Sequence, residues 1–332
     1  MPLQILLFTL VRRTNLKQQL ESTARNIIMP NLDFLIEKCQ KLGRIPAAIV
    51  DPRSAVALSG ALQAYTQGII EPILIGPQAE IEQIAKDNQL DISALKIVNT
   101  VDDISAAATS AQMASNGEVH CLVKGSLHTD IMMHAVLQPE YNLRTKRLIS
   151  SCCLMHLPTY NRLVFLADMV MNIAPTLEQK VQILENAVDM ARALGWEMPK
   201  VAIIAAVEVV NLKMPATVDA AIIAKMADRG QIENCVVDGP IDLDIAISPE
   251  AAKIKHFKSP IMGDADILIM PDLQAANALY KEMIFMGKVD AADVILGASV
   301  PIIVTSRADD EETRLHSIAA AALIAHNKIK RD

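Results

Sequence analysis

The sequence predicts an α/β protein with mostly parallel sheets. Short, continuous apolar runs that end in turn residues recur along the chain, and stretches with the periodicity of helices separate them. Such runs are typical of strands that helices cover on both faces, and the regular alternation indicates parallel pairing. The composition agrees, because 52% of the residues are hydrophobic but only 3% are aromatic, so aliphatic side chains fill the layers. A length of 332 residues is enough for two domains.

Each half of the chain contains four of these apolar runs, and each run predicts a strand. The runs of the first half are PAAIVDP (46–52), EPILIGP (71–77), LKIVNT (95–100) and VHCLVKGS (119–126). Those of the second half are KVAIIAAVEVV (200–210), NCVVDGP (234–240), ADILIMPD (265–272) and PIIVTSR (301–307). One helix, predicted over 176–195, has clear ends: Thr176 and Gln179 have capping-box spacing, and Gly195 suits the C-terminal cap.

The segment 139–175 breaks this rhythm. It holds two apolar runs joined by Pro158, which fits a β-hairpin or a pair of neighbouring strands. We expect the chain to cross between two closely connected α/β domains here.

Charge and cysteine content exclude several classes of protein. A net charge of -7 argues against a nucleic-acid-binding protein, which would need a basic stripe, and an anionic substrate would need local Lys and Arg. The five cysteines form no CxxC pair, which indicates reduced thiols and a cytoplasmic protein. The opening MPLQILLFTLVRR is too short to span a membrane, and its charges follow its apolar core. We expect an N-terminal helix or an overlong start there, and no targeting signal.

Candidate ligand-binding residues follow the apolar runs, because ligands of open parallel sheets bind beyond the carboxyl ends of the strands. KGSLHTD (124–130) places Lys124, Gly125, Ser126 and Thr129 at a strand-to-helix turn. The free N–H groups and partial positive charge of a helix N-terminus suit phosphate. The alternative is that Ser126 or Thr129 only caps the helix.

A second candidate is PDLQAANALYK (271–281). Asp272 follows a strand, and Asn277 and Lys281 are four residues apart on one face of the predicted helix, so they point towards one place. The alternative is a solvated helix face with Asp272 as the N-cap.

The third candidate is VTSRADDEETR (304–314). Arg307 suits phosphate oxygens through its planar guanidinium, Ser306 can donate a hydrogen bond to charge on a carbonyl, and one of the acids can accept a proton. The alternative is that the acids only stabilise the helix dipole, by about 0.3–1 kcal/mol each.

Several familiar motifs are missing from the sequence. The seven histidines form no HExxH or other metal-ligand pair, and there is no GxGxxG, GxxxxGK[ST] or GxSxG motif. We therefore expect no metal, no nucleotide cofactor and no α/β-hydrolase nucleophile.

Four strings together resemble the phosphate acetyl/butyryl transferases: KGSLHTD, VVDGPIDLDIAIS, GDADILIMPDLQAANALYK and ILGASVPIIVTSRADDEETRLHSIAAA. The resemblance covers the chain from about residue 25 to its end, and the last string is more similar to the butyryltransferase branch than to the acetyltransferase branch. It implies the two-domain fold of isocitrate and isopropylmalate dehydrogenases, with an interdomain cleft. The first domain would comprise 1–148 plus 292–332, and the second, through which the family forms homodimers, 149–291. A metal-dependent dehydrogenase of that fold is disfavoured, because the metal-binding Asp cluster and the nucleotide loop are missing.

The resemblance also implies an activity, the reversible transfer of an acyl group between coenzyme A and phosphate, with coenzyme A as a substrate and no cofactor. Arg307 would bind phosphate and Ser306 would stabilise the transition state. The remaining members of the implied anion site are Lys124, Gly125, Ser126, Thr129, Asp272, Asn277 and Lys281. The alternative is a regulatory domain that binds acyl-CoA without turnover.

Two positions depart from the family pattern. The catalytic acid of the acetyltransferase branch falls about where this chain has Thr313, so Asp309 is the best candidate for the base, with Asp310 and Glu312 behind it. Ala276 replaces the glycine that commonly precedes Asn277, and its added methyl could crowd a ligand.

Overall fold

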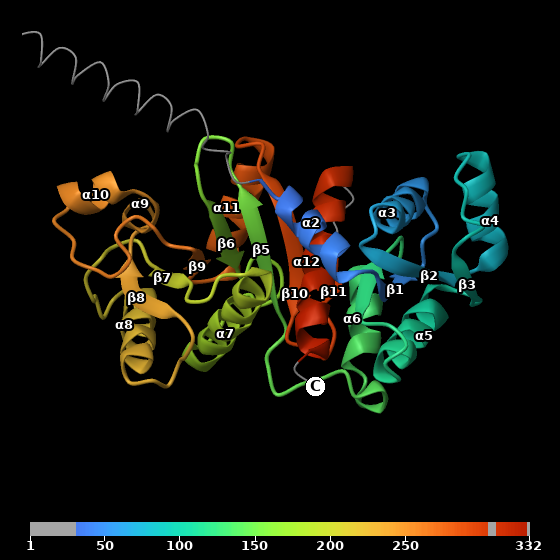
Figure 1. Cartoon of the computed structure of the whole chain (residues 1–332). Helices are drawn as coiled ribbons and strands as arrows, with labels where there is room; N and C mark the ends of the chain where they lie inside the picture. Colours follow the sequence, from blue (N-terminus) through green and yellow to red (C-terminus); the bar gives the residue numbers. More distant parts are fainter. Residues whose placement is uncertain (1–30, 305–309, 331–332) are drawn as a thin grey trace, which may run out of the picture. The chain divides into compact units, whose positions relative to one another are not determined.

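The computed structural model describes residues 31–304 and 310–330 (Figure 1). Within these residues, eleven strands form one sheet in the order β3-β2-β1-β4-β11-β10-β5-β6-β9-β7-β8. The first-half strands are β1 (Ile45–Val50), β2 (Ile70–Gly76), β3 (Lys96–Asn99) and β4 (Cys121–Lys124). The others are β5 (Ser150–His156), β6 (Leu163–Ala167), β7 (Lys200–Ile204), β8 (Val236–Ile241), β9 (Ile267–Ile269), β10 (Asp290–Leu296) and β11 (Ile302–Ile303). The α/β class and the mostly parallel pairing are confirmed.

Helices alternate with the strands as the sequence predicts. Those of the first half are α2 (Asp33–Leu42), α3 (Ala55–Thr66), α4 (Gln78–Asp87), α5 (Asp103–Ser115) and α6 (Thr129–Leu137), followed by the 3-10 turn η1 (Pro139–Tyr141). The second half contains α7 (Leu177–Leu194), α8 (Pro215–Asp228), α9 (Leu243–Ile247), α10 (Pro249–Ile254), α11 (Leu273–Phe285) and α12 (Glu311–Ile329). No helix in the described ranges is both long and apolar enough to cross a membrane. The helix expected at the N-terminus lies outside the described residues.

All eight apolar runs contain a strand, and the irregular segment 139–175 contains the antiparallel pair β5–β6. The predicted ends of α7 are also confirmed. Thr176 and Gln179 form a capping box, and Gly195 ends the helix in the left-handed conformation at φ 117°. Local sequence signals were therefore sufficient for these elements.

The sequence did not predict β10, which takes part in two of the three antiparallel pairings in the centre of the sheet. β10 pairs antiparallel with both β11 and β5, and β5 pairs antiparallel with β6. These three reversals make β6 and β9 run opposite to β4 and β11. A single sheet runs through both proposed domains, and the division at 148/149 and 291/292 stays a prediction.

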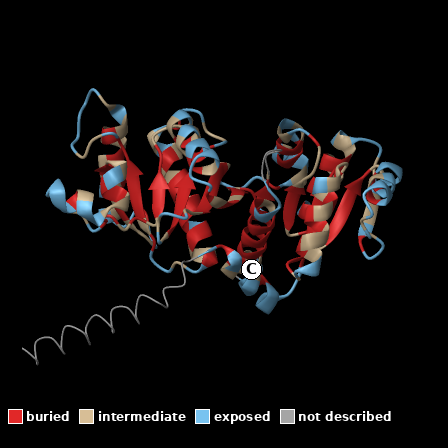
Figure 2. Cartoon of the chain, turned by 90° about the horizontal axis from the view of Figure 1, so that it is seen from above, coloured by how far each residue is buried: buried red, intermediate tan, exposed pale blue. Residues whose placement is uncertain are grey.

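Both faces of the sheet are buried, which is why its strands read as continuous apolar runs. In β1, Ile49 packs in a cluster with residues of α2, α3 and α12, whereas Val50 packs on the opposite face with residues of α5 and α6. Figure 2 shows the strands as buried between partly exposed helices. Most of α12 is buried as well, because it contacts β10 beneath it and α2, α3 and α7 around it.

Candidate active site

The turn after β4 forms the best-defined part of the candidate site. The backbone N–H of Gly125 donates to Val50 O at 2.8 Å, and that of Ser126 donates to Asp51 O at 2.7 Å, so the turn is held against the end of β1. Lys124 ends β4, and its Nζ donates to the carbonyls of Gly125 and Leu127, both at 3.2 Å. The ammonium group therefore lies over the turn.

Ser126 and Thr129 are not helix caps. The N-cap of α6 is His128, and no side chain caps this helix. The Ser126 hydroxyl is buried and has no hydrogen-bond partner within the described ranges. The capping alternative is therefore wrong for this turn, and a buried hydroxyl without a partner beside a helix N-terminus suits an anionic ligand.

The strand that leads to the Ser-Arg pair lies beside this turn. In β11, Ile303 is the partner of Val123 in the neighbouring parallel strand β4, so these two strands end side by side. Ser306, Arg307 and Asp309 lie outside the described residues, and their catalytic roles stay predictions. The structure resumes at Asp310, whose carboxylate accepts a hydrogen bond from Thr313 N at 2.8 Å and caps α12.

The second group of predicted site residues lies at the N-cap of α11 and within this helix. Asp272 is the N-cap of this helix and accepts a hydrogen bond from Ala275 N at 2.9 Å. This cap was the alternative to a role in ligand binding. Asn277 donates its side-chain amide to Met169 O at 3.1 Å. The Lys281 ammonium lies 5.5 Å from the centre of the Tyr280 ring, and among the described residues it shares no hydrogen-bond partner with Asn277. Ala276 is fully buried in the core, so its methyl group does not face a ligand.

The two groups of predicted site residues, at the turn after β4 and on α11, follow strands that run in opposite directions. β9, which leads to Asp272 and Asn277, runs antiparallel to β4, which leads to Lys124. The carboxyl ends of β4 and β9 therefore point in opposite directions, and the two groups of residues follow these ends. The resemblance to the family implies that both groups line one anion site, and their shared role in binding stays a prediction.

Asp168 is a prominent polar residue that the sequence analysis missed. It directly follows β6 and is only 4% exposed. Its carboxylate accepts hydrogen bonds from the backbone N–H groups of Ser151, Val170, Met171 and Asn172 and from the side chains of Ser151 and Asn172. It thereby shapes the 168–172 loop, to which Asn277 binds. The sequence carries a signal for it, since Asp168 ends the apolar run RLVFLAD and so follows a strand as the other candidates do.

Comparison with known proteins connects this site to a family. A family model described as phosphate acetyl/butaryl transferase matches residues 100–322. Phosphate acetyltransferase from Rhizobium meliloti is 44% identical over 293 residues, which are 88% of this chain and 93% of the relative. Phosphate butyryltransferase from Clostridium acetobutylicum is 39% identical over 291 residues, 88% of this chain and 96% of the relative.

A solved structure agrees with these sequence matches. The crystal structure of a branched-chain phosphotransacylase from Enterococcus faecalis V583 superposes with a TM-score of 0.76 at 31% identity and covers 85% of this chain and 99% of its own. Relatives named for acetyl and for butyryl groups match over similar lengths, and the preference for the butyryl branch stays a prediction. The chain belongs to the phosphate acetyl/butaryl transferase family.

Proposed function

We propose that this protein transfers a short acyl group reversibly between coenzyme A and inorganic phosphate. The observation that carries the proposal is family membership, which is supported over most of the chain by relatives named phosphate acetyltransferase and phosphate butyryltransferase. The match favours a transferase over a regulatory domain that binds acyl-CoA without turnover. The Lys124–Thr129 turn beside the end of β11 supplies cationic and hydroxyl groups suited to phosphate.

In the direction of acyl-CoA synthesis, a base removes the proton from the coenzyme A thiol. The thiolate attacks the carbonyl carbon of the acyl phosphate, a C–S bond forms, and a tetrahedral oxyanion results. The C–O bond to phosphate then breaks, and phosphate leaves with the electron pair. Ser306 donates a hydrogen bond to the oxyanion and Arg307 binds the phosphate oxygens, which are interactions worth several kcal/mol when they are preorganised.

Asp309 is the base that we favour. Asp310 already caps α12 through its carboxylate, and Glu312 lies exposed beside His316 one turn further along this helix. Thr313, at the position of the acid in the acetyltransferase branch, is buried and cannot accept the proton as a carboxylate would.

The finer features of the family complete the proposal: two domains with a cleft, a homodimer formed through 149–291, a cytoplasmic location and no cofactor. Dimer formation is supported by exposed apolar side chains in the second of these domains. Val209, Val210 and Leu212 are 68%, 54% and 85% exposed, which is unusual for three such residues close together.

Phosphate-dependent release of free thiol from acetyl-, propionyl-, butyryl- and crotonyl-CoA tests the proposal. We expect turnover that requires phosphate, and a loss of at least about 100-fold in kcat/KM with Arg307→Ala, because one preorganised donor contributes that much. Arg229→Ala is the matched control, since Arg229 is exposed at the end of α8. Binding of coenzyme A without thiol release from any donor would contradict the transferase and favour the regulatory domain.

The thiols of the protein itself should contribute little to this assay. Cys39, Cys121, Cys152 and Cys153 are buried, and Cys235 is partly buried. Burial raises the pKa of Cys39 and Cys121 to about 12 and that of Cys235 to about 11. Because the thiolate is the reactive form, these thiols stay protonated and slow at pH 8.

With the reagent DTNB at pH 8 we expect at most one slowly reacting thiol per native chain, and five after unfolding in guanidinium. Cys235→Ser should remove the slow native reaction. Rapid reaction of two or more thiols in the native protein would show that these cysteines are more accessible than the structure has them.

A further inference from the structure

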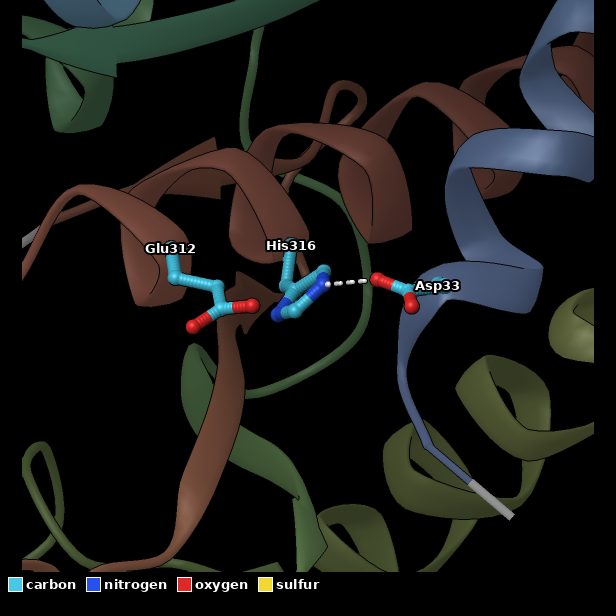
Figure 3. Close-up of side chains that lie close together, drawn as sticks. All are labelled: Asp33, Glu312 and His316. Carbon is cyan, nitrogen blue, oxygen red and sulfur yellow. Dashed lines mark ion pairs between the residues drawn. The ribbon is translucent and has the colours of Figure 1, made fainter. Parts of the chain in front are cut away.

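Three potential metal ligands meet where α2 and α12 begin (Figure 3). Asp33 is the first residue of α2, and Glu312 and His316 lie one turn apart on α12. One ligand atom from each of these side chains lies within 4.8 Å of the others. The i, i+4 spacing places Glu312 and His316 on the same face of α12, towards α2.

His316 provides a second, independent indication of a ligand. Its imidazole is only 3% exposed, and neither ring nitrogen has a hydrogen-bond partner among the described residues. The Asp33 carboxylate lies 3.5 Å from Nε2, which is longer than the 2.7–3.2 Å typical of N–H···O hydrogen bonds. A buried imidazole is costly to leave without a partner, so its position calls for one.

The spacing suits a metal better than it suits a hydrogen bond. Ligands about 2.0–2.2 Å from a tetrahedral ion lie roughly 3.3–3.6 Å from one another, which includes the separation of His316 and Asp33. Glu312 is exposed, so its side chain can rotate to complete the site. One imidazole and two carboxylates also leave a fourth position for water.

The other acidic cluster of the described chain shows the contrast. Glu208, Asp242 and Asp244 lie as close together, but the ammonium of Lys255 is 2.8 Å, 3.1 Å and 3.0 Å from their carboxylates. That cluster already has its cation. No Lys or Arg forms an ion pair with Asp33 or Glu312 among the pairs found in the described ranges.

We propose that Asp33, Glu312 and His316 bind a divalent transition-metal ion, with Zn²⁺ as the best fit. A nitrogen ligand disfavours Mg²⁺ and Ca²⁺, which take oxygen ligands. The ion links the start of α2 to the start of α12. Its ligand Glu312 is three residues beyond Asp309 in the sequence. The ion also occupies the carboxylate of Glu312, which removes this residue from the candidate bases. No sequence motif predicts this site, because Asp33 is distant from the other two ligands along the chain.

Metal titration of the full chain, after treatment with EDTA and dialysis, tests the proposal. We expect one Zn²⁺ per chain by calorimetry and visible absorption bands when Co²⁺ replaces it. The melting temperature should rise by several degrees when free Zn²⁺ is about 100 times its dissociation constant, whereas Mg²⁺ should have no such effect. Asp33→Asn and Glu312→Gln should each weaken Zn²⁺ binding at least about tenfold, and His316→Ala should abolish it.

Two matched variants control for other ligands. Glu311→Gln changes a neighbouring acid outside the cluster, and His134→Ala removes an exposed histidine from α6. Both should bind Zn²⁺ as the unchanged protein does. The proposal is overturned if no ion binds, or if binding survives Asp33→Asn and Glu312→Gln, which still decide the question should His316→Ala fail to fold. The cluster would then be a contact between the imidazole and the carboxylates without a bound ion.

Discussion

Asp168→Ala should lower the free energy of unfolding by about 3–5 kcal/mol, because it removes a buried charge from a complete set of hydrogen bonds. The donors from Ser151, Val170, Met171 and Asn172 would lose an acceptor that is itself buried. Each buried donor left without a partner costs about 1–3 kcal/mol. Urea unfolding measures the change directly, and the melting temperature should fall by on the order of 10 °C.

Conservative and exposed variants calibrate this result. Asp168→Asn keeps the shape and one carbonyl oxygen, so its effect should be intermediate. Asp228→Ala removes a carboxylate that is 62% exposed and forms an exposed ion pair with Lys225, and it should change stability by less than about 0.5 kcal/mol. If Asp168→Ala is as stable as Asp228→Ala, the carboxylate does not hold the 168–172 loop.

The second large effect is expected for Gly125→Ala, which should destabilise the protein by about 3 kcal/mol or more. A Cβ atom at residue 125 would overlap the carbonyl oxygen of Asp51 and lie 2.6 Å from that of Val50. These are backbone atoms, which cannot turn away as a flexible side chain can. The turn would have to leave the end of β1, and its hydrogen bonds to Val50 and Asp51 would be lost.

Thiol release should fall together with stability, since the displaced turn carries Lys124 and Ser126. Gly60→Ala is the matched control because a Cβ atom there meets nothing within 4 Å and Gly60 lies inside α3. Alanine favours helix over glycine by about 0.5–1 kcal/mol, so this variant should be as stable as the unchanged protein or slightly more stable. Equal stability of the two variants would contradict the close packing at Gly125.

Local sequence signals predicted most of the fold, and long-range pairing accounts for what they missed. Eight strands could be read as apolar runs because helices bury both faces of the sheet. β10 could not, since Asp290 and Asp293 interrupt its apolar pattern. Asp290 lies beside His156, and the backbone N–H of Asp293 donates a hydrogen bond to the Ser317 hydroxyl. No local sequence pattern reveals these contacts.

The same distinction between local signals and long-range pairing applies to the candidate site. The Lys124–Thr129 turn could be predicted because it directly follows a strand. Its relation to Asn277 could not, because the relative direction of two strands depends on every pairing between them. The cluster of Asp33 with His316 likewise depends on the packing of α2 against α12, which brings together residues from the two ends of the described chain.

The position of β10 and β11 has a consequence for synthesis of the chain on the ribosome. These two strands come last in the sequence, yet they lie between β4 and β5. Until they emerge, β4 and β5 each present an unpaired edge, and unpaired edges favour aggregation. The nascent chain can form β1–β4 and β5–β9 early, but only its final segment joins them into one sheet.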